Sequence, residues 1–145
     1  AGLFTRRGFN IESLVVGETE DKSVSRMTIV SSGDERIMEQ VEKQLNKQID
    51  VIKVKTLDDI KTTKRELLLI KVAYQSSNRS EIMELCVIMK AKIVDISHST
   101  LVIELTDRPE KVDLFIDMIM PFGIVEMART GMVALQKGSD AIEIN

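Results

Sequence analysis

The side chains that could perform nucleophilic, acid–base or metal chemistry are few. His98 is the only histidine among the 145 residues, and it stands in a short polar stretch between two apolar runs. Cys86 is the only cysteine, and it falls on the apolar face of an expected helix. A reactive thiol needs an electropositive, accessible setting, and a metal site needs several ligands together. We therefore predict an exposed turn histidine and a buried structural thiol.

Carboxylates are more numerous, but they fall in polar segments. Glu18, Glu20 and Asp21 share one expected loop, and Asp58 and Asp59 share another. Two carboxyl groups act as acid and base only when an apolar setting separates their pKa values, so these positions predict solvated surface. The sequence also lacks the glycine-rich patterns that bind nucleotide phosphates. Its residue types therefore favour a protein that binds a ligand or bridges subunits over an enzyme.

Composition and charge exclude further classes. Hydrophobic residues make up 43% and charged residues 30%, which is typical of a globular protein. The net charge of −3 leaves no basic surplus for nucleic acid, and no apolar run approaches the roughly 18–20 residues of a membrane span. We expect a cytoplasmic protein, since one cysteine suits a reducing compartment, or a plastid protein if a transit segment has been removed before Ala1.

Hydrophobic periodicity predicts an α+β order in the first half of the chain. The expected elements are a helix over 1–7 ended by Gly8, strands over 11–16 and 24–30, a helix over 37–49 and a strand over 51–54. This order is a split βαβ plan without its opening strand. The polar residues 58–65 that follow are expected to be a linker.

The second half predicts a complete β-α-β-β-α-β plan, which is ferredoxin-like. The expected elements are strands over 66–74, 93–96 and 101–105, helices over 82–89 and from Pro109 to Gly123, and extended segments over 124–128 and 132–135. Aromatic residues are only 3% and tryptophan is absent. We therefore expect an aliphatic core filled out by methionines, namely Met83, Met89, Met118 and Met120.

Several stretches, in order along nearly the whole chain, resemble the regulatory (small) subunits of acetohydroxyacid synthase, also called acetolactate synthase. The two most specific are Arg7-Gly8-Phe9-Asn10-Ile11-Glu12-Ser13-Leu14, preceded by Gly2-Leu3-Phe4, and Val24-Ser25-Arg26-Met27-Thr28-Ile29. The others are residues 39–47, 65–72, 92–95 and 125–131.

This resemblance implies two tandem ferredoxin-like βαββαβ units in a homodimer. The first is an ACT domain over residues 1–57, then comes the linker over 58–65 and a C-terminal ferredoxin-like domain over 66–145. The family begins with a strand and a loop of the form Asn-x-x-Gly-x-Leu, which would precede Ala1. In this sequence the ACT domain therefore lacks its first strand.

The resemblance also implies the function. Such subunits are non-catalytic: they bind and activate the catalytic subunit, and confer feedback inhibition by valine or a related branched-chain amino acid on valine, leucine and isoleucine biosynthesis. Thiamine diphosphate, magnesium and FAD belong to the catalytic chain, and no cofactor is expected in this one.

Asn10 and Ile11 are the expected effector-binding residues. Valine is a zwitterion, so its pocket must offer both hydrogen-bond donors and acceptors. The Asn10 amide offers both, where a helix end turns into a strand and backbone groups are available. Ile11 would add its backbone and a branched apolar wall. The residues alone favour a role in which Asn10 caps or turns the chain, whereas the resemblance favours the ligand role.

Three other functions remain open. One is an amino-acid-sensing ACT protein that controls a different biosynthetic enzyme. The second is a transcription regulator, which would need a DNA-binding helix pair more basic than any segment here. The third is a stand-alone enzyme, which the missing catalytic set opposes.

Overall fold

The computed structural model describes residues 10–33, 35–47, 50–51 and 53–142. It divides into two compact units: residues 1–63 with 133–145 form unit 1, and residues 64–132 form unit 2. The expected helix over 1–7 lies outside the described residues. None of the described helices is long and apolar enough to cross a membrane.

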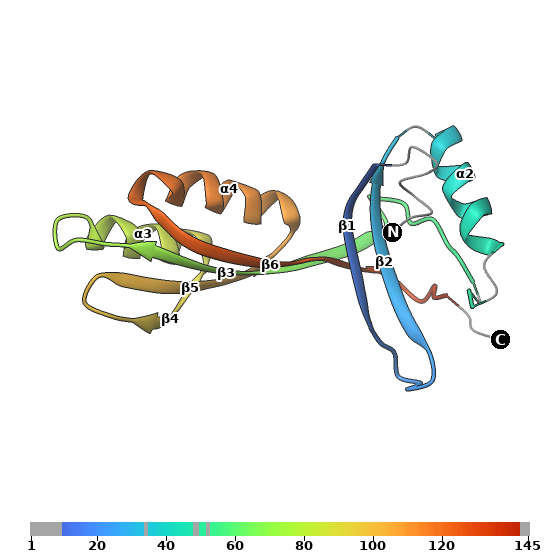
Figure 1. Ribbon diagram of the computed structural model, residues 1–145, viewed down its shortest axis with the longest axis horizontal. Helices are drawn as coiled ribbons and strands as arrows, with labels where there is room; N and C mark the ends of the chain where they lie inside the picture. Colours follow the sequence, from blue (N-terminus) through green and yellow to red (C-terminus); the bar gives the residue numbers. More distant parts are fainter. Residues whose placement is uncertain (1–9, 34, 48–49, 52, 143–145) are drawn as a thin grey trace. The chain divides into compact units, whose positions relative to one another are not determined.

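Unit 1 contains an antiparallel hairpin of β1 (Asn10–Glu18) and β2 (Ser25–Ser32) (Figure 1). Both strands were expected from their β-branched and apolar runs, and both are confirmed. The side chain of Arg26 on β2 donates a hydrogen bond of 2.9 Å to the carbonyl oxygen of Ala134, which belongs to the same unit. Unit 1 therefore joins residues that lie more than a hundred positions apart.

The connection between β1 and β2 is held by its own polar side chains. The Thr19 amide donates to the carbonyl of Val24 over 3.1 Å, and the Thr19 hydroxyl donates to the same oxygen over 2.9 Å. The Asp21 carboxylate accepts from the hydroxyl and the amide of Ser23 at 2.7 and 3.0 Å. These bonds hold the pKa of Asp21 below its ordinary value, as expected of a carboxylate whose charged form accepts hydrogen bonds.

Unit 1 continues with α2 (Glu35–Asn46). The side chain of Val41 on this helix is buried. The helix expected over 37–49 is thus confirmed through Asn46, and Ile49 lies outside the described residues. The strand expected over 51–54 is wrong for the residues that are described, since 51, 53 and 54 have no strand conformation. So short an apolar run forms a strand only where a neighbouring strand pairs with it.

Unit 2 is built on a four-stranded sheet with the order β4-β5-β3-β6 (Figure 1). The strands are β3 (Thr62–Ala73), β4 (Lys92–Ile96), β5 (Thr100–Asp107) and β6 (Ile124–Gln136). β5 runs antiparallel to both β3 and β4. β6 is antiparallel to β3 as well, since Ala73 bonds to Gly123 at one end and Leu67 to Thr130 further along. This is the strand order of a ferredoxin-like βαββαβ unit.

Two helices cover one face of this sheet: α3 (Arg79–Met89) and α4 (Pro109–Ile119), the latter followed by the short η1 (Met120–Phe122). Alternate residues of the two central strands are buried against them, as the two-residue period of a strand requires. The core residues are Leu68, Ile70 and Val72 of β3, Leu101, Ile103 and Leu105 of β5, Ile82, Leu85 and Cys86 of α3, and Val112, Phe115, Ile116 and Ile119 of α4.

The expectation that methionines fill this core is wrong for three of the four. Met89 packs against the core, but Met83, Met118 and Met120 are exposed. The reason is helical phase: each residue turns the side chain by about 100°, so Met83 points away from the stripe that its neighbour Ile82 joins. Apolar character alone did not separate the two faces of these helices.

Two boundaries also differ from the sequence expectation. Residues 62–65 of the expected linker are strand, because β3 begins at Thr62, whose side chain is buried. The two extended segments expected over 124–128 and 132–135 form one strand, β6. The strands that pair with β3 and β6 are distant in sequence. The local pattern of polar residues therefore predicted the start of β3 and the continuity of β6 incorrectly. The domain limits themselves, 1–57 and 66–145, stay a prediction.

Candidate functional site

The histidine and the cysteine, the two side chains most suited to acid–base or nucleophilic chemistry, lie in the surroundings that the sequence predicted. His98 is exposed in the turn between β4 and β5. Cys86 on α3 is only 3% exposed, and burial raises the pKa of its thiol. Since the thiolate is the reactive form of cysteine, this residue is an inert part of the core.

The carboxylates singled out from the sequence are also surface groups. Glu18, Glu20 and Asp21 are exposed in and beside the β1–β2 connection, and Asp58 and Asp59 are exposed before β3. Among the described residues, no group of three or more histidine, cysteine, aspartate or glutamate side chains could hold a metal ion. The expected effector-binding residues, Asn10 and Ile11, stand at the start of β1.

Asn10 and Ile11 open β1, and the hairpin places two hydroxyl residues across from them. The Cα atom of Asn10 pairs with that of Ser32, and the Cα atom of Ile11 pairs with that of Ser31. Ile11 is half-buried, while the side chain of Asn10 lies outside the described part of the chain. The register then shifts, so that Ser13 pairs with Val30. Such an irregularity bends a strand and redirects its side chains, and it is common beside binding sites.

Three serines, Ser13, Ser31 and Ser32, therefore lie at or next to this irregularity. Each hydroxyl can donate one hydrogen bond and accept others, which is the mixed character that a zwitterionic ligand requires. Sequence reasoning missed these residues, because only the register of the hairpin brings them opposite Asn10 and Ile11. The repeated serines at the end of an apolar strand are the one signal that could have drawn attention to them.

The backbone that follows Ser32 is specific to glycine. Gly33 has a φ of +154°, and a Cβ atom placed on it would lie 2.8 Å from the Cγ2 atom of Ile37. Real Cβ atoms do not approach other atoms so closely, so a side chain here would displace α2 or the end of β2. Gly33 thus allows the chain to turn from the end of β2, beside the candidate site, into α2.

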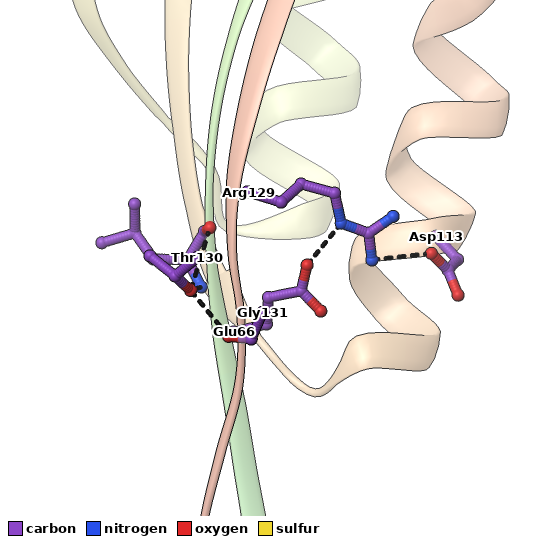
Figure 2. A network of polar contacts seen from close by, with 6 residues as sticks. Glu66, Asp113, Arg129, Thr130 and Gly131 are labelled. Atoms are coloured by element: carbon purple, nitrogen blue, oxygen red, sulfur yellow. Dashed lines mark hydrogen bonds and ion pairs between the residues drawn. The ribbon is translucent and has the colours of Figure 1, made fainter. Parts of the chain in front are cut away.

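Unit 2 contains a second polar cluster, centred on Arg129 of β6 (Figure 2). The Arg129 Nε atom donates to the carboxylate of Glu66, and its Nη2 atom donates to Asp113 of α4 over 2.9 Å. The Glu66 side chain is only 6% exposed. The hydrogen bond to Glu66, followed by that to Asp113, raises the pKa of Arg129 against the opposing effect of burial. Arg129 therefore neutralises a buried charge and ties three elements together.

The neighbouring Thr130 joins the same two strands (Figure 2). Its hydroxyl oxygen accepts a hydrogen bond of 3.1 Å from the backbone amide of Leu67. The hydroxyl lies 2.7 Å from the carbonyl oxygen of Gly131, to which it can donate. Arg129 and Thr130 thus attach β6 to β3 from consecutive positions, which is a structural role rather than a binding one.

Sequence reasoning did not assign this cluster any role. Glu66 occupies the first position of an alternating series whose later members, Leu68, Ile70 and Val72, are all buried. A glutamate in that register must find a cation or remain unpaired in the core. The register itself was therefore a usable signal, although the identity of the partner, 63 residues away, was not.

Comparison with known protein families gives two adjacent matches. Residues 1–53 match the model of the AHAS small subunit-like ACT domain. Residues 65–138 match the model of the small subunit of acetolactate synthase, in the domain that follows. The fold and these matches define an α+β protein of two tandem ferredoxin-like units, the first an ACT domain.

Similar proteins agree over nearly the full chain. The probable acetolactate synthase small subunit of Methanothermobacter thermautotrophicus is 52% identical over 96% of this chain and 83% of its own length. The acetolactate synthase small subunit of Mycobacterium bovis is 46% identical over 98% of this chain and 84% of its own. The crystal structure of the acetolactate synthase small subunit from Thermotoga maritima superposes with a TM-score of 0.89 at 40% identity, covering 96% of this chain and 87% of that one.

The chain belongs to the family of acetolactate synthase small subunits. The resemblance noted in the sequence is thereby confirmed, and so is the fold class that it implied.

Proposed function

We propose that this chain is the regulatory subunit of acetolactate synthase: it binds and activates the catalytic subunit, and it makes the enzyme sensitive to feedback inhibition by valine. Family membership supports the partnership, because a small subunit implies a catalytic one. The chain itself performs no catalysis in this proposal. Thiamine diphosphate, magnesium and FAD act in the catalytic subunit, and the complex works in the cytoplasm, or in a plastid if a transit segment has been removed.

The register shift beside Asn10 and Ile11 is the observation that supports an effector site. The irregularity lies between Ile11 and Ser13, opposite Ser31 and Val30. The irregularity interrupts the regular hydrogen bonding between β1 and β2. A bound amino acid would need backbone donors and acceptors at such a place. Asn10 would bind the polar groups of valine, and Ile11 would contact its side chain. Ser32, whose Cα atom pairs with that of Asn10, would add a hydroxyl group from the facing strand.

The proposed assembly is a homodimer bound to the catalytic subunit, with no nucleic acid and no membrane as partner. In the part of the chain that the structure describes, β1 and β2 pair only with each other. Each strand therefore has one edge without a described neighbour, and such edges pair readily with a further strand. A ligand bound where two copies meet would favour one dimer arrangement through its differential affinity, commonly about 1–3 kcal/mol.

Reconstitution with the cognate catalytic subunit tests this function. Acetolactate formation should rise when the chain is added and should fall again with valine. The chain alone, given thiamine diphosphate, magnesium and FAD, should form no acetolactate. If the chain binds the subunit of a different biosynthetic enzyme and leaves acetolactate formation unchanged, the proposed partner is wrong.

Substitution of Asn10 by alanine in the full-length protein tests the effector site. The variant should weaken valine inhibition about ten- to hundred-fold, because a ligand group left without its partner costs about 1–3 kcal/mol. Activation without valine should persist, since it depends on the surface that meets the catalytic subunit. An unchanged inhibition curve would remove Asn10 from the site, and loss of both properties would show that Asn10 supports the fold.

A further inference from the structure

Strand β6 belongs to both units. It covers Ile124–Gln136, and the boundary between the units falls inside it, because unit 2 ends at residue 132 and unit 1 resumes at residue 133. At this point the chain therefore passes from one unit to the other as strand rather than as a loop. Rigid secondary elements and chains of hydrogen bonds carry energetic coupling between distant sites, and β6 is such an element.

The part of β6 that lies in unit 1 is bonded to the hairpin that carries the expected effector-binding residues. β2 has Ser32, which pairs with Asn10, at one end and Arg26, which pairs with Gly17, near the other. The Nη2 atom of Arg26 donates a hydrogen bond of 2.9 Å to the carbonyl oxygen of Ala134, a residue that is only 5% exposed. A charged donor makes a stronger hydrogen bond than a neutral one, so this bond holds β6 to β2 within the same unit.

A backbone bond also holds the chain just beyond the end of β6. The Lys137 amide donates to the carbonyl of Lys61 over 2.8 Å. Neither of these residues belongs to β1 or β2, so this bond does not follow the position of the hairpin. Arg26, by contrast, joins β6 directly to a strand of the hairpin.

The part of β6 that lies in unit 2 is anchored as well (Figure 2). Arg129 donates to the carboxylates of Glu66 on β3 and Asp113 on α4. Since Glu66 is buried, displacing Arg129 would leave a buried charge without its partner, which is costly. Any displacement of β6 at this point would therefore be passed on to β3 and α4.

One residue between the two anchored parts could absorb such a displacement. Gly131 has a φ of +82°, where glycine has more conformational freedom than other residues. Its neighbour Thr130 restrains it, because the Thr130 hydroxyl lies 2.7 Å from the Gly131 carbonyl oxygen and also accepts a hydrogen bond from the Leu67 amide. The strand is thus held on both sides of the boundary between the units and at the glycine itself.

We infer that β6 transmits the occupancy of the effector site from unit 1 to unit 2, that Arg26 is the positioning residue that couples the hairpin to this strand, and that feedback inhibition depends on this coupling. The inference rests on the proposed function, because it takes valine to bind beside Asn10 and Ile11. Valine would favour one position of β1 and β2 through its differential affinity, and Arg26 would impose that position on Ala134 and so on β6.

Hydrogen–deuterium exchange of the full-length protein measures this coupling, with valine as the probe. In the wild type, valine should slow the exchange of backbone amides in residues 124–130, which lie in unit 2, by at least about fivefold, the lower end of ordinary coupling between two sites. Arg26→Met keeps the apolar stem of the side chain and removes the donor. This variant should still bind valine in calorimetry, but the slowing in residues 124–130 should fall below about twofold.

Arg36→Met is the matched control, because Arg36 is an exposed arginine on α2 of the same unit. It should leave the effect of valine on residues 124–130 unchanged, and the enzyme reconstituted with it should be inhibited as the wild type is. Arg26→Met should still activate the catalytic subunit. With this variant, the residual activity at saturating valine should be at least about threefold higher than with the wild type, because the occupied site no longer acts on unit 2.

The possible failures are distinguishable. If the wild type neither binds valine nor is inhibited by it, the proposed effector site is wrong and the inference is wrong with it. If the wild type binds valine and is inhibited, yet residues 124–130 exchange at an unchanged rate, only the inference is wrong. If Arg26→Met responds to valine as the wild type does, another contact couples the hairpin to β6, and if it no longer binds valine, Arg26 supports the effector site itself. Either of these last two results overturns the role that we assign to Arg26.

Discussion

Arg129 offers the sharpest test of what holds unit 2 together. Its two acidic partners differ in exposure: the Glu66 side chain is 6% exposed and that of Asp113 is 63% exposed. An exposed ion pair contributes about 0–1 kcal/mol, so the bond to Asp113 matters little. Removing the partner of a buried charge costs about 3–5 kcal/mol. Because the Arg129 side chain is itself about one-third exposed, we expect Arg129→Met to cost about 2–3 kcal/mol.

The assay is urea unfolding followed by tyrosine fluorescence. The chain has one tyrosine and no tryptophan, and Tyr74 packs against the core of unit 2, so the signal reports that unit. At an unfolding slope of about 1–3 kcal/mol per molar urea, the midpoint should fall by roughly 1–2 M. Methionine keeps much of the apolar stem of arginine, so the change isolates the loss of charge and hydrogen bonds.

A second substitution shows whether the buried charge is the cause. Adding Glu66→Gln to Arg129→Met removes the unpaired carboxylate, and the double variant should regain at least about 1 kcal/mol over Arg129→Met alone. The control Asp113→Asn should cost about 0.5 kcal/mol or less. If the double variant is as unstable as Arg129→Met, the cost does not come from an unpaired Glu66. The reasoning would then be refuted.

Three further predictions concern single features. Lys90 ends α3 with φ 59° and ψ 37°, a conformation that glycine adopts without strain, so Lys90→Gly should stabilise unit 2 by about 0.5–1 kcal/mol, and a lower melting temperature would contradict this. Burial and a raised pKa protect the thiol of Cys86, so a thiol reagent should modify it only as the protein unfolds; prompt modification of the native chain would count against it. Limited proteolysis should cut first within 58–61, where Ile60 is exposed, and leave a folded fragment that contains unit 2, whereas first cleavage inside α2 would argue against a linker there.

Features set by short-range pattern were predictable from the sequence. The hairpin strands, the buried stripes of α3 and α4, and the alternation in β5 follow from the periods of 2 and 3.6 residues. The surface position of His98 and the burial of Cys86 followed from the same patterns. The family could also be recognised, because the motifs that identify it are short runs of consecutive residues, which can be read without knowing the fold.

Features that depend on distant partners were not predictable. Thr62 and its neighbours are polar, yet they form strand within a sheet whose other members lie further along the chain. Residues 51–54 have the composition of a strand, but composition does not supply a partner. The pairing of Glu66 with Arg129, and of Ile11 with Ser31, depends on register, which a single sequence does not contain.

The division of the chain also bears on the order in which it folds during synthesis. Unit 2 is continuous, from residue 64 to 132, whereas unit 1 combines residues 1–63 with residues 133–145. Domains usually fold in the order in which the ribosome produces them. Here residues 1–63 are synthesised before Ala134, whose carbonyl accepts a hydrogen bond from Arg26 of the same unit. All the residues of unit 2 are therefore synthesised before residues 133–145, which complete unit 1.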